Sequence, residues 1–158
     1  MKLSEIVPQG AIHIGLASTE RDDAITEIVD SLVASKIIKP ELRQEVLDAV
    51  LERERRGSTG FGKGVAVPHV KHPQIKKMAA AIATSEHGVD FNALDKQPVY
   101  SIFLLLSPAG NPEEHLQAME VIFKNLSLDR FRRFLRQAAT VEDVRTLLDD
   151  ADNQRLVG

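Results

Sequence analysis

The chain has 158 residues, of which 43% are hydrophobic and 27% are charged, a balance that suits one globular domain and excludes a disordered protein. It contains no cysteine, so disulfides, zinc–thiolate sites and thiol catalysis are excluded. Because it has neither a signal-like start nor a run of about eighteen apolar residues, we expect a cytoplasmic protein without membrane insertion. The net charge of −3 gives no reason to expect a nucleic-acid partner.

A short strand and two helices are expected in the first third of the chain. Alternating apolar residues predict the strand at residues 11–16. Thr19 and Asp22 resemble a capping box, and apolar residues at helical spacing follow as far as Val33. Pro40 suits the first position of the second helix, whose apolar face continues at the same spacing.

The rest of the chain alternates in the same way. Strands are predicted at residues 65–67, 78–84 and 99–106, and the last is apolar almost throughout, as a central strand covered on both faces would be. Helices are predicted to begin at three signals, which are Asn111 with Pro112, Asp129, and Thr140 with Asp143. The alternation predicts an α/β fold with a central sheet between layers of helices. We assign residues 1–151 to this single domain and expect residues 152–158 to be a frayed tail.

Basic residues gather in the segment from Glu52 to Lys77. It holds seven basic and two acidic residues, a net charge of +5, so the remainder of the chain carries −8. A basic segment on an acidic protein suits an anionic ligand or an acidic partner surface. A solvated basic face without a ligand is the alternative.

Glycines are concentrated at residues 57–64, where four in eight positions indicate positive φ or close approach to another group. A phosphate-binding P-loop needs Gly-Lys followed by Ser or Thr at the start of a helix, whereas Lys63 is followed by glycine and a strand. A dinucleotide-binding loop follows a strand, whereas this segment follows a helix. Two interpretations remain, a structural turn and an anion site in which free amides and the Ser58 and Thr59 hydroxyls hold phosphoryl oxygens.

This segment leads through a short strand to Pro68 and His69. Imidazole is a nucleophile near neutral pH because its ordinary pKa is about 6.5, so much of it carries a free lone pair. A histidine fixed by a preceding proline, beside amide and hydroxyl donors, has the parts of a phosphohistidine site. The alternative is a histidine at a strand end that only packs.

Arg53 and His115 are the other candidate site residues. Arg53 extends the buried stripe of its helix into the last turn, where its guanidinium either points at a phosphoryl group on His69 or extends into solvent. His115 lies in the first turn of the helix opened by Asn111, where free amides favour a neutral imidazole that donates to an anion. A surface histidine without a role is the alternative.

Metal binding is a rival use of the histidines. A zinc site of His69, His72 and His115 would lack the helical or hairpin spacing and the cysteine or carboxylate ligands usual for zinc, and Pro73 argues against a helix there. We therefore predict no metal and no organic cofactor.

The chain from Arg53-Glu54 through residues 57–69 resembles the signature of enzyme IIA domains of the phosphoenolpyruvate-dependent phosphotransferase system, of the fructose/mannitol class that includes nitrogen-regulatory enzyme IIA. Residues 90–99, the following apolar strand and His115-Leu116 also match in order and separation. The resemblance implies an α/β fold with a mixed sheet between helical layers. It also implies phosphorylation of His69 by the carrier HPr or its nitrogen-branch relative, with His115 and Arg53 in the active site.

In transport members the phosphoryl group passes on to an enzyme IIB cysteine, whereas a regulatory member binds target proteins according to its phosphorylation state. The Gln97-Pro98-Val99 stretch and the lone-domain length favour the stand-alone regulatory type. A binding module that has lost phosphotransfer is the alternative from another class. Phe61 stands where the family usually has an aliphatic residue, and we expect it at the tip of the glycine segment, either exposed for partner docking or folded over Val65 or Val67.

Overall fold

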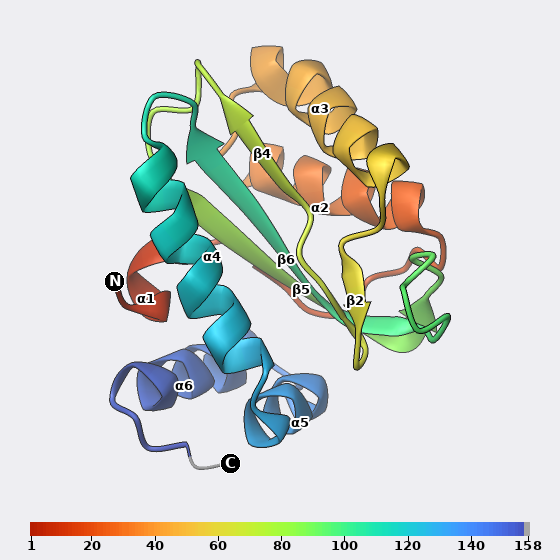
Figure 1. The fold of residues 1–158 in the computed structure, drawn as a ribbon, viewed down its shortest axis with the longest axis vertical. Coiled ribbons are helices and arrows are strands. Elements are labelled where there is room, and N and C mark those ends of the chain that lie inside the picture. The colour runs from red at the N-terminus through yellow and green to blue at the C-terminus, as the bar shows by residue number, and fades with distance from the viewer. Residues whose placement is uncertain (157–158) are drawn as a thin grey trace.

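A computed structural model describes residues 1–156 and shows one mixed sheet. Its strands are ordered β1-β5-β6-β3-β2, and β4 also pairs with β6 (Figure 1). The β1–β5, β3–β6 and β4–β6 pairs are parallel, and the β5–β6 and β2–β3 pairs are antiparallel. The strands are β1 (Ile12–His13), β2 (Gly60–Gly62), β3 (Val65–Ala66), β4 (His69–His72), β5 (Ala79–Val89) and β6 (Val99–Pro108).

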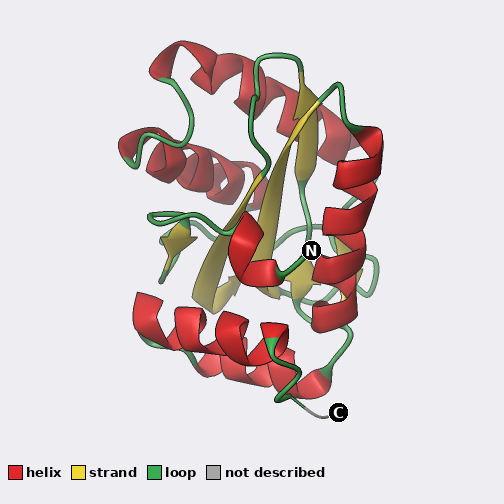
Figure 2. Ribbon diagram, turned by 90° about the vertical axis from the view of Figure 1, so that its left-hand side faces the viewer, coloured by secondary structure: helices red, strands yellow, loops and turns green. Residues whose placement is uncertain are grey.

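Helices cover both faces of this sheet, as the alternating pattern predicts (Figure 2). The layer over β4 and β5 contains α2 (Arg21–Ala34) and α3 (Arg43–Arg56), with a short 3-10 turn, η1 (Pro40–Leu42), between them. The other layer contains α1 (Leu3–Ile6), α4 (Pro112–Leu126), α5 (Asp129–Gln137) and α6 (Val141–Asp152). No helix within residues 1–156 is both long enough and apolar enough to cross a membrane.

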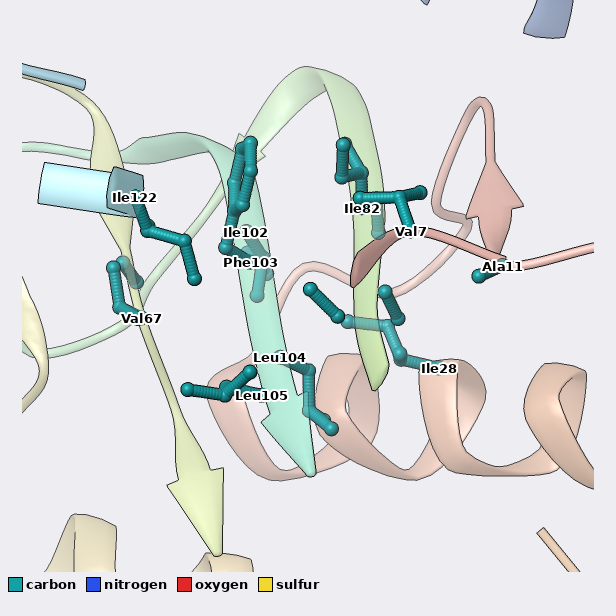
Figure 3. Packing of buried hydrophobic residues seen from close by; sticks show 14 of the residues in the cluster. Val7, Ala11, Ile28, Val67, Ile82, Ile102, Phe103, Leu104, Leu105 and Ile122 are labelled. Atoms are coloured by element: carbon teal, nitrogen blue, oxygen red, sulfur yellow. The ribbon is translucent and has the colours of Figure 1, made fainter. Parts of the chain in front are cut away.

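The core lies on the two sides of β6, the predicted central strand. Figure 3 shows the β6 side chains between Ile28 of α2 and Ile122 of α4. Phe103 and Leu104 are fully buried, because a strand covered on both faces has no solvent side. The predicted apolar strand and the helical layers are therefore confirmed.

Two predictions near the N-terminus need correction. The strand predicted at residues 11–16 is present but limited to Ile12–His13, because Gly15 adopts a left-handed φ of 79° and turns the chain. Helix α2 has Glu20 rather than Thr19 as its N-cap, and no side chain caps it. The backbone of residues 19–21 is instead paired with Asp90: the Asp90 amide donates to the Thr19 carbonyl, and the Arg21 amide donates to the Asp90 carbonyl. A long-range pairing has replaced the local cap.

The glycine segment forms a β2–β3 hairpin with a tight turn. Lys63 and Gly64 form its tip, with φ of 61° and 76°, as a two-residue turn of type I′ requires. The prediction that Phe61 lies at the tip is wrong, since Phe61 lies within β2. Its ring is half-buried against Phe123 of α4, with centroids 4.9 Å apart, so it packs on a helix rather than over the adjacent strand.

The last helix begins as predicted. Thr140 and Asp143 form a capping box in which each side chain accepts from the other residue's backbone amide. Helix α6 continues to Asp152, whose carboxylate accepts a hydrogen bond from the Ser4 hydroxyl near the N-terminus. Of the tail predicted for residues 152–158, residues 157–158 lie outside the described residues.

Candidate active site

His69 begins β4 and has one ring nitrogen in a fixed bond. Its Nδ1 lies 2.9 Å from the Val67 carbonyl oxygen. A carbonyl oxygen only accepts, so Nδ1 carries the proton and Nε2 of the neutral ring carries the lone pair. The ring is half-buried beside the buried Pro68. The local sequence therefore presents Nε2 as the free nucleophilic atom.

The register between β4 and β6 determines which side chains surround that ring. His69 pairs with Leu105, and Lys71 pairs with Ser107 in the same parallel ladder. Because side chains alternate along a strand, His69 and Lys71 project from one face of β4 and Val70 and His72 from the other. Paired residues of adjacent strands share a face, so Ser107 lies on the side of His69.

Helix α4 covers that face and brings His115 to it. The His69 and His115 ring centroids are 5.6 Å apart with planes inclined at 55°. The His115 side chain is buried, and its Nδ1 lies 2.7 Å from the Ser107 hydroxyl oxygen. Asn111 caps the helix by accepting from the Glu114 amide, which fixes the first turn on which His115 stands. Two histidines separated by 46 positions in the chain thus meet at one site.

The bond to Ser107 selects the His115 tautomer. Ser107 is fully buried, and its hydroxyl has no other acceptor recorded among residues 1–156. If Nδ1 carried the proton, the buried hydroxyl proton would have no partner, at a cost of about 1–3 kcal/mol. Ser107 therefore donates to Nδ1, and the proton of neutral His115 lies on Nε2.

Burial and charge keep His115 neutral. Desolvation lowers the pKa of His115 below the ordinary value of 6.5, and repulsion from His69 and Lys71 lowers it further. The ring is therefore a hydrogen-bond donor at neutral pH. The site combines one free lone pair, one neutral N–H donor and one nearby ammonium group, a set that can hold an anionic group against His69.

Arg53 lies in the last turn of α3, immediately before the glycine hairpin. Its guanidinium donates from Nη1 to the Gly57 carbonyl oxygen at 2.8 Å in an exposed hydrogen bond. The structure thus brings the rings of His69 and His115 together, whereas Arg53 forms its hydrogen bond with the backbone just beyond its own helix.

The Ser58 and Thr59 hydroxyls already have partners. Ser58 donates to the Phe91 carbonyl oxygen at 2.9 Å and accepts from the Gly60 amide. Thr59 donates to Glu54 at 2.6 Å, and the same carboxylate accepts from the Thr59 amide. Glu54 is 1% exposed, so these bonds satisfy a buried polar side chain and anchor the start of the hairpin.

His72 lies on the opposite face of β4 from His69. Its Nε2 is 2.9 Å from a Glu45 carboxylate oxygen on α3. A zinc site that includes His69, His72 and His115 would require His72 to leave Glu45 and cross the strand. No cluster of three metal-ligating side chains occurs among the residues that the structure describes.

Comparison with known proteins identifies the family of the chain. The family described as "Phosphoenolpyruvate-dependent sugar phosphotransferase system, EIIA 2" matches residues 5–151. The chain belongs to this family. Enzyme IIA proteins of this family are components of a phosphotransferase system.

Relatives of two kinds resemble this enzyme IIA equally. A nitrogen regulatory protein of Pseudomonas aeruginosa is 32% identical over 97% of this chain and 98% of its own. A fructose-specific EIIA component of Haloferax volcanii is 32% identical over 92% of this chain and 94% of its own. The fructose-specific EIIABC component of Bacillus subtilis is 31% identical over 96% of this chain, which spans only 24% of that protein.

A solved structure shares the fold. The nitrogen regulatory protein IIA-Ntr of Neisseria meningitidis superposes with a TM-score of 0.83 at 29% identity, over 92% of this chain and 98% of that one. The fold inferred from the enzyme IIA resemblance, a mixed sheet between helical layers, is therefore confirmed.

Sequence reasoning missed three residues that the structure places in or beside the candidate site. In the sequence, Ser107 is a single polar residue in an apolar strand, and Glu54 is one of several charged residues at a helix end. Lys71 contributes to the sequence analysis only through the charge of the basic segment. The signal for Ser107 and Glu54 was their polarity at positions where the surrounding pattern predicts burial, since a buried polar group needs a partner.

Proposed function

We propose that this protein is a phosphocarrier that accepts a phosphoryl group on Nε2 of His69 from a histidine-phosphorylated carrier of the HPr type. The observation that supports this is the bond from His69 Nδ1 to the Val67 carbonyl, which leaves Nε2 as the nucleophile. The Nε2 lone pair forms the new N–P bond while the N–P bond of the donor breaks, and the donor nitrogen takes back that electron pair. The Val67 carbonyl stabilises the positive charge that the His69 ring gains.

His115 and Lys71 stabilise the transferred group in this proposal. The Nε2–H of neutral His115 donates to a phosphoryl oxygen, and burial by α4 makes that bond stronger than it would be in water. Lys71 lies close enough to affect His115 electrostatically and supplies a positive charge from the same face of β4. Arg53 contributes if its guanidinium exchanges the Gly57 carbonyl for a phosphoryl oxygen, which bidentate geometry favours.

Ser58 and Thr59 remain predicted phosphoryl-binding residues, but direct binding requires each hydroxyl to give up its present acceptor. The Thr59–Glu54 bonds are buried, so breaking them leaves a buried carboxylate with fewer partners. We therefore propose that these residues act mainly by holding the hairpin before His69 in place.

We further propose that the protein belongs to the regulatory branch and acts in the cytoplasm without a metal or organic cofactor. The match over nearly the full length of a nitrogen regulatory protein and the superposition on IIA-Ntr support this branch. Its phosphorylation state would then control binding to target proteins. Transfer to an enzyme IIB cysteine is the transport alternative, supported by the fructose-specific relatives.

The test is incubation with phosphoenolpyruvate, enzyme I and either the sugar-branch or the nitrogen-branch carrier. We expect one acid-labile phosphoryl group per chain, assigned to Nε2 of His69 by NMR. His69→Ala should abolish labelling, and His72→Ala, which removes a histidine from the other face of the same strand, should not. Full labelling of His69→Ala would refute the assignment, and absence of labelling in the unaltered protein would favour a binding module without phosphotransfer.

A further inference from the structure

A second basic site lies away from the histidine pair. A cavity of about 640 Å³ opens between the β2–β3 hairpin tip at Lys63, the start of β6 at Tyr100, and helix α5. His115 stands in the first turn of α4, and α5 follows the end of that helix, which lies about 16 Å further along its axis. Figure 1 shows α5 at the opposite end of α4 from β4 and the α4 N-terminus. We propose that this pocket binds a small anion that carries at least two phosphate groups.

The charge of the pocket favours such a ligand. Four basic side chains and one acidic side chain line it, a net charge of +3 in a protein whose total is −3. Arg132 is already bound to the Asp129 carboxylate and to the Leu126 carbonyl oxygen. The other three cationic side chains of the pocket are Lys63, Arg133 and Arg136. Within residues 1–156 they form no ion pair with a carboxylate. Neutralising three cations around one space requires more than a single negative charge.

Arg136 is held in place before any ligand binds. Its guanidinium carbon lies 3.5 Å from the centroid of the half-buried Tyr100 ring. Stacking on an aromatic face fixes the guanidinium plane and leaves its edge N–H groups free for bidentate bonds to a phosphate. Such a side chain loses less conformational freedom on binding than a free arginine.

The hairpin tip is held against the same tyrosine. The Tyr100 amide donates to the Gly64 carbonyl oxygen at 2.8 Å, and the Lys63 amide donates to the Asp95 carboxylate at 3.1 Å. A Cβ atom on Gly64 would lie 3.3 Å from the Tyr100 ring, at a residue whose φ is already left-handed. Glycine at this position therefore allows the close approach that brings Lys63 to the pocket.

The size and convergence of the pocket favour a compact ligand over a peptide. A volume of about 640 Å³ lies within the range of about 300–1,000 Å³ typical of small-molecule sites. The cations come from two segments about 70 positions apart in the chain and line one space, so one polyphosphate can contact them together. An acidic segment of a partner protein is the competing occupant, and the experiment distinguishes the two.

The experiment is a titration of the full-length protein with pyrophosphate and ATP, followed by amide NMR and by calorimetry, in the His69→Ala background to remove the histidine site. We expect saturable binding with shifts at residues 63–65, 100–101 and 129–137. Arg133→Gln with Arg136→Gln should weaken binding at least tenfold. The matched control is Arg55→Gln with Arg56→Gln on the exposed end of α3, which removes the same charge outside the pocket and should leave binding within twofold.

Equal weakening by both double variants would overturn the proposal, because it would show attraction to net charge rather than to a site. Absence of saturable binding to both anions at millimolar concentration would also overturn it. Binding of a glutamate-rich peptide without binding of pyrophosphate or ATP would replace it with a protein-docking surface. The melting temperature of each variant shows whether lost binding reflects lost folding, and Lys63→Gln, on the hairpin, gives a second variant independent of α5.

Discussion

Strand β4 carries two histidines whose surroundings differ although they are three positions apart. His69 faces α4, donates to a backbone carbonyl and has a second histidine within 5.6 Å. His72 faces α3 and is paired with the Glu45 carboxylate at 2.9 Å. The Nε2 lone pair of His69 is free and lies beside the neutral His115 donor and Lys71. The Nε2 atom of His72 is instead bonded to the Glu45 carboxylate.

This difference teaches that the chemistry open to a histidine is defined by what surrounds it. A nucleophile in phosphoryl transfer needs an unoccupied lone pair and positive or neutral donors for the incoming anion. A carboxylate such as Glu45 would repel a phosphoryl group, so the His72 face is unsuited to accept one. The following experiments compare the two faces.

The largest effect is expected at His115. His115→Ala removes the donor that faces His69, and we expect phosphotransfer to slow about 100- to 1,000-fold, as for loss of one preorganised donor to an anion. His72→Ala, measured in the same assay, should change the rate less than about twofold. Equal losses in the two variants would contradict the distinction between the faces.

A smaller effect is expected at Ser107. Ser107→Ala removes the bond that holds His115 in its Nε2–H tautomer. We expect transfer to slow about five- to tenfold, which corresponds to about 1 kcal/mol of lost hydrogen bonding. Ser101→Ala, a buried serine earlier in β6, is the control and should leave the transfer rate unchanged.

Protonation of His115 should respond to phosphorylation and to pH. Its pKa is lowered in the unphosphorylated protein, and an anionic phosphoryl group on His69 should raise it, since opposite charges favour the protonated ring. NMR titration of both rings measures this, and the His72 ring signals should change little on phosphorylation. A His115 pKa that stays the same would place the phosphoryl group away from this ring.

The same pKa predicts how stability depends on pH. The folded protein protonates His115 less readily than the unfolded chain, so the unfolded state binds the proton first as the pH falls below about 6.5. The free energy of unfolding should therefore decrease through that window, and His115→Asn should flatten this part of the profile. Urea denaturation at several pH values tests it.

The smallest effect is expected on the other face. Glu45→Gln removes the carboxylate that contacts His72, but Glu45 is 60% exposed, so we expect a stability change below about 0.5 kcal/mol. Phosphotransfer should not change. A marked loss of transfer in this variant would show that the two faces of β4 are coupled.

The sequence alone determined most of the fold and singled out two candidate site residues, His69 and His115. Capping and apolar periodicity located the helices at Pro112, Asp129 and Thr140, because these signals lie within a few residues of one another. The proline and glycine pattern singled out His69. Local chemistry was sufficient for these predictions.

The tertiary structure decided which groups act together. The parallel register of β4 and β6 places Ser107 on the face of His69, and α4 then brings His115 onto Ser107. The pairing of residues 19–21 with Asp90 likewise replaced the local cap that the sequence favoured. These contacts join residues far apart in the chain, and a shift of one residue in the register would turn Ser107 to the opposite face. Sequence periodicity specifies which positions are buried, but only the packed sheet specifies the partner that each buried polar group finds.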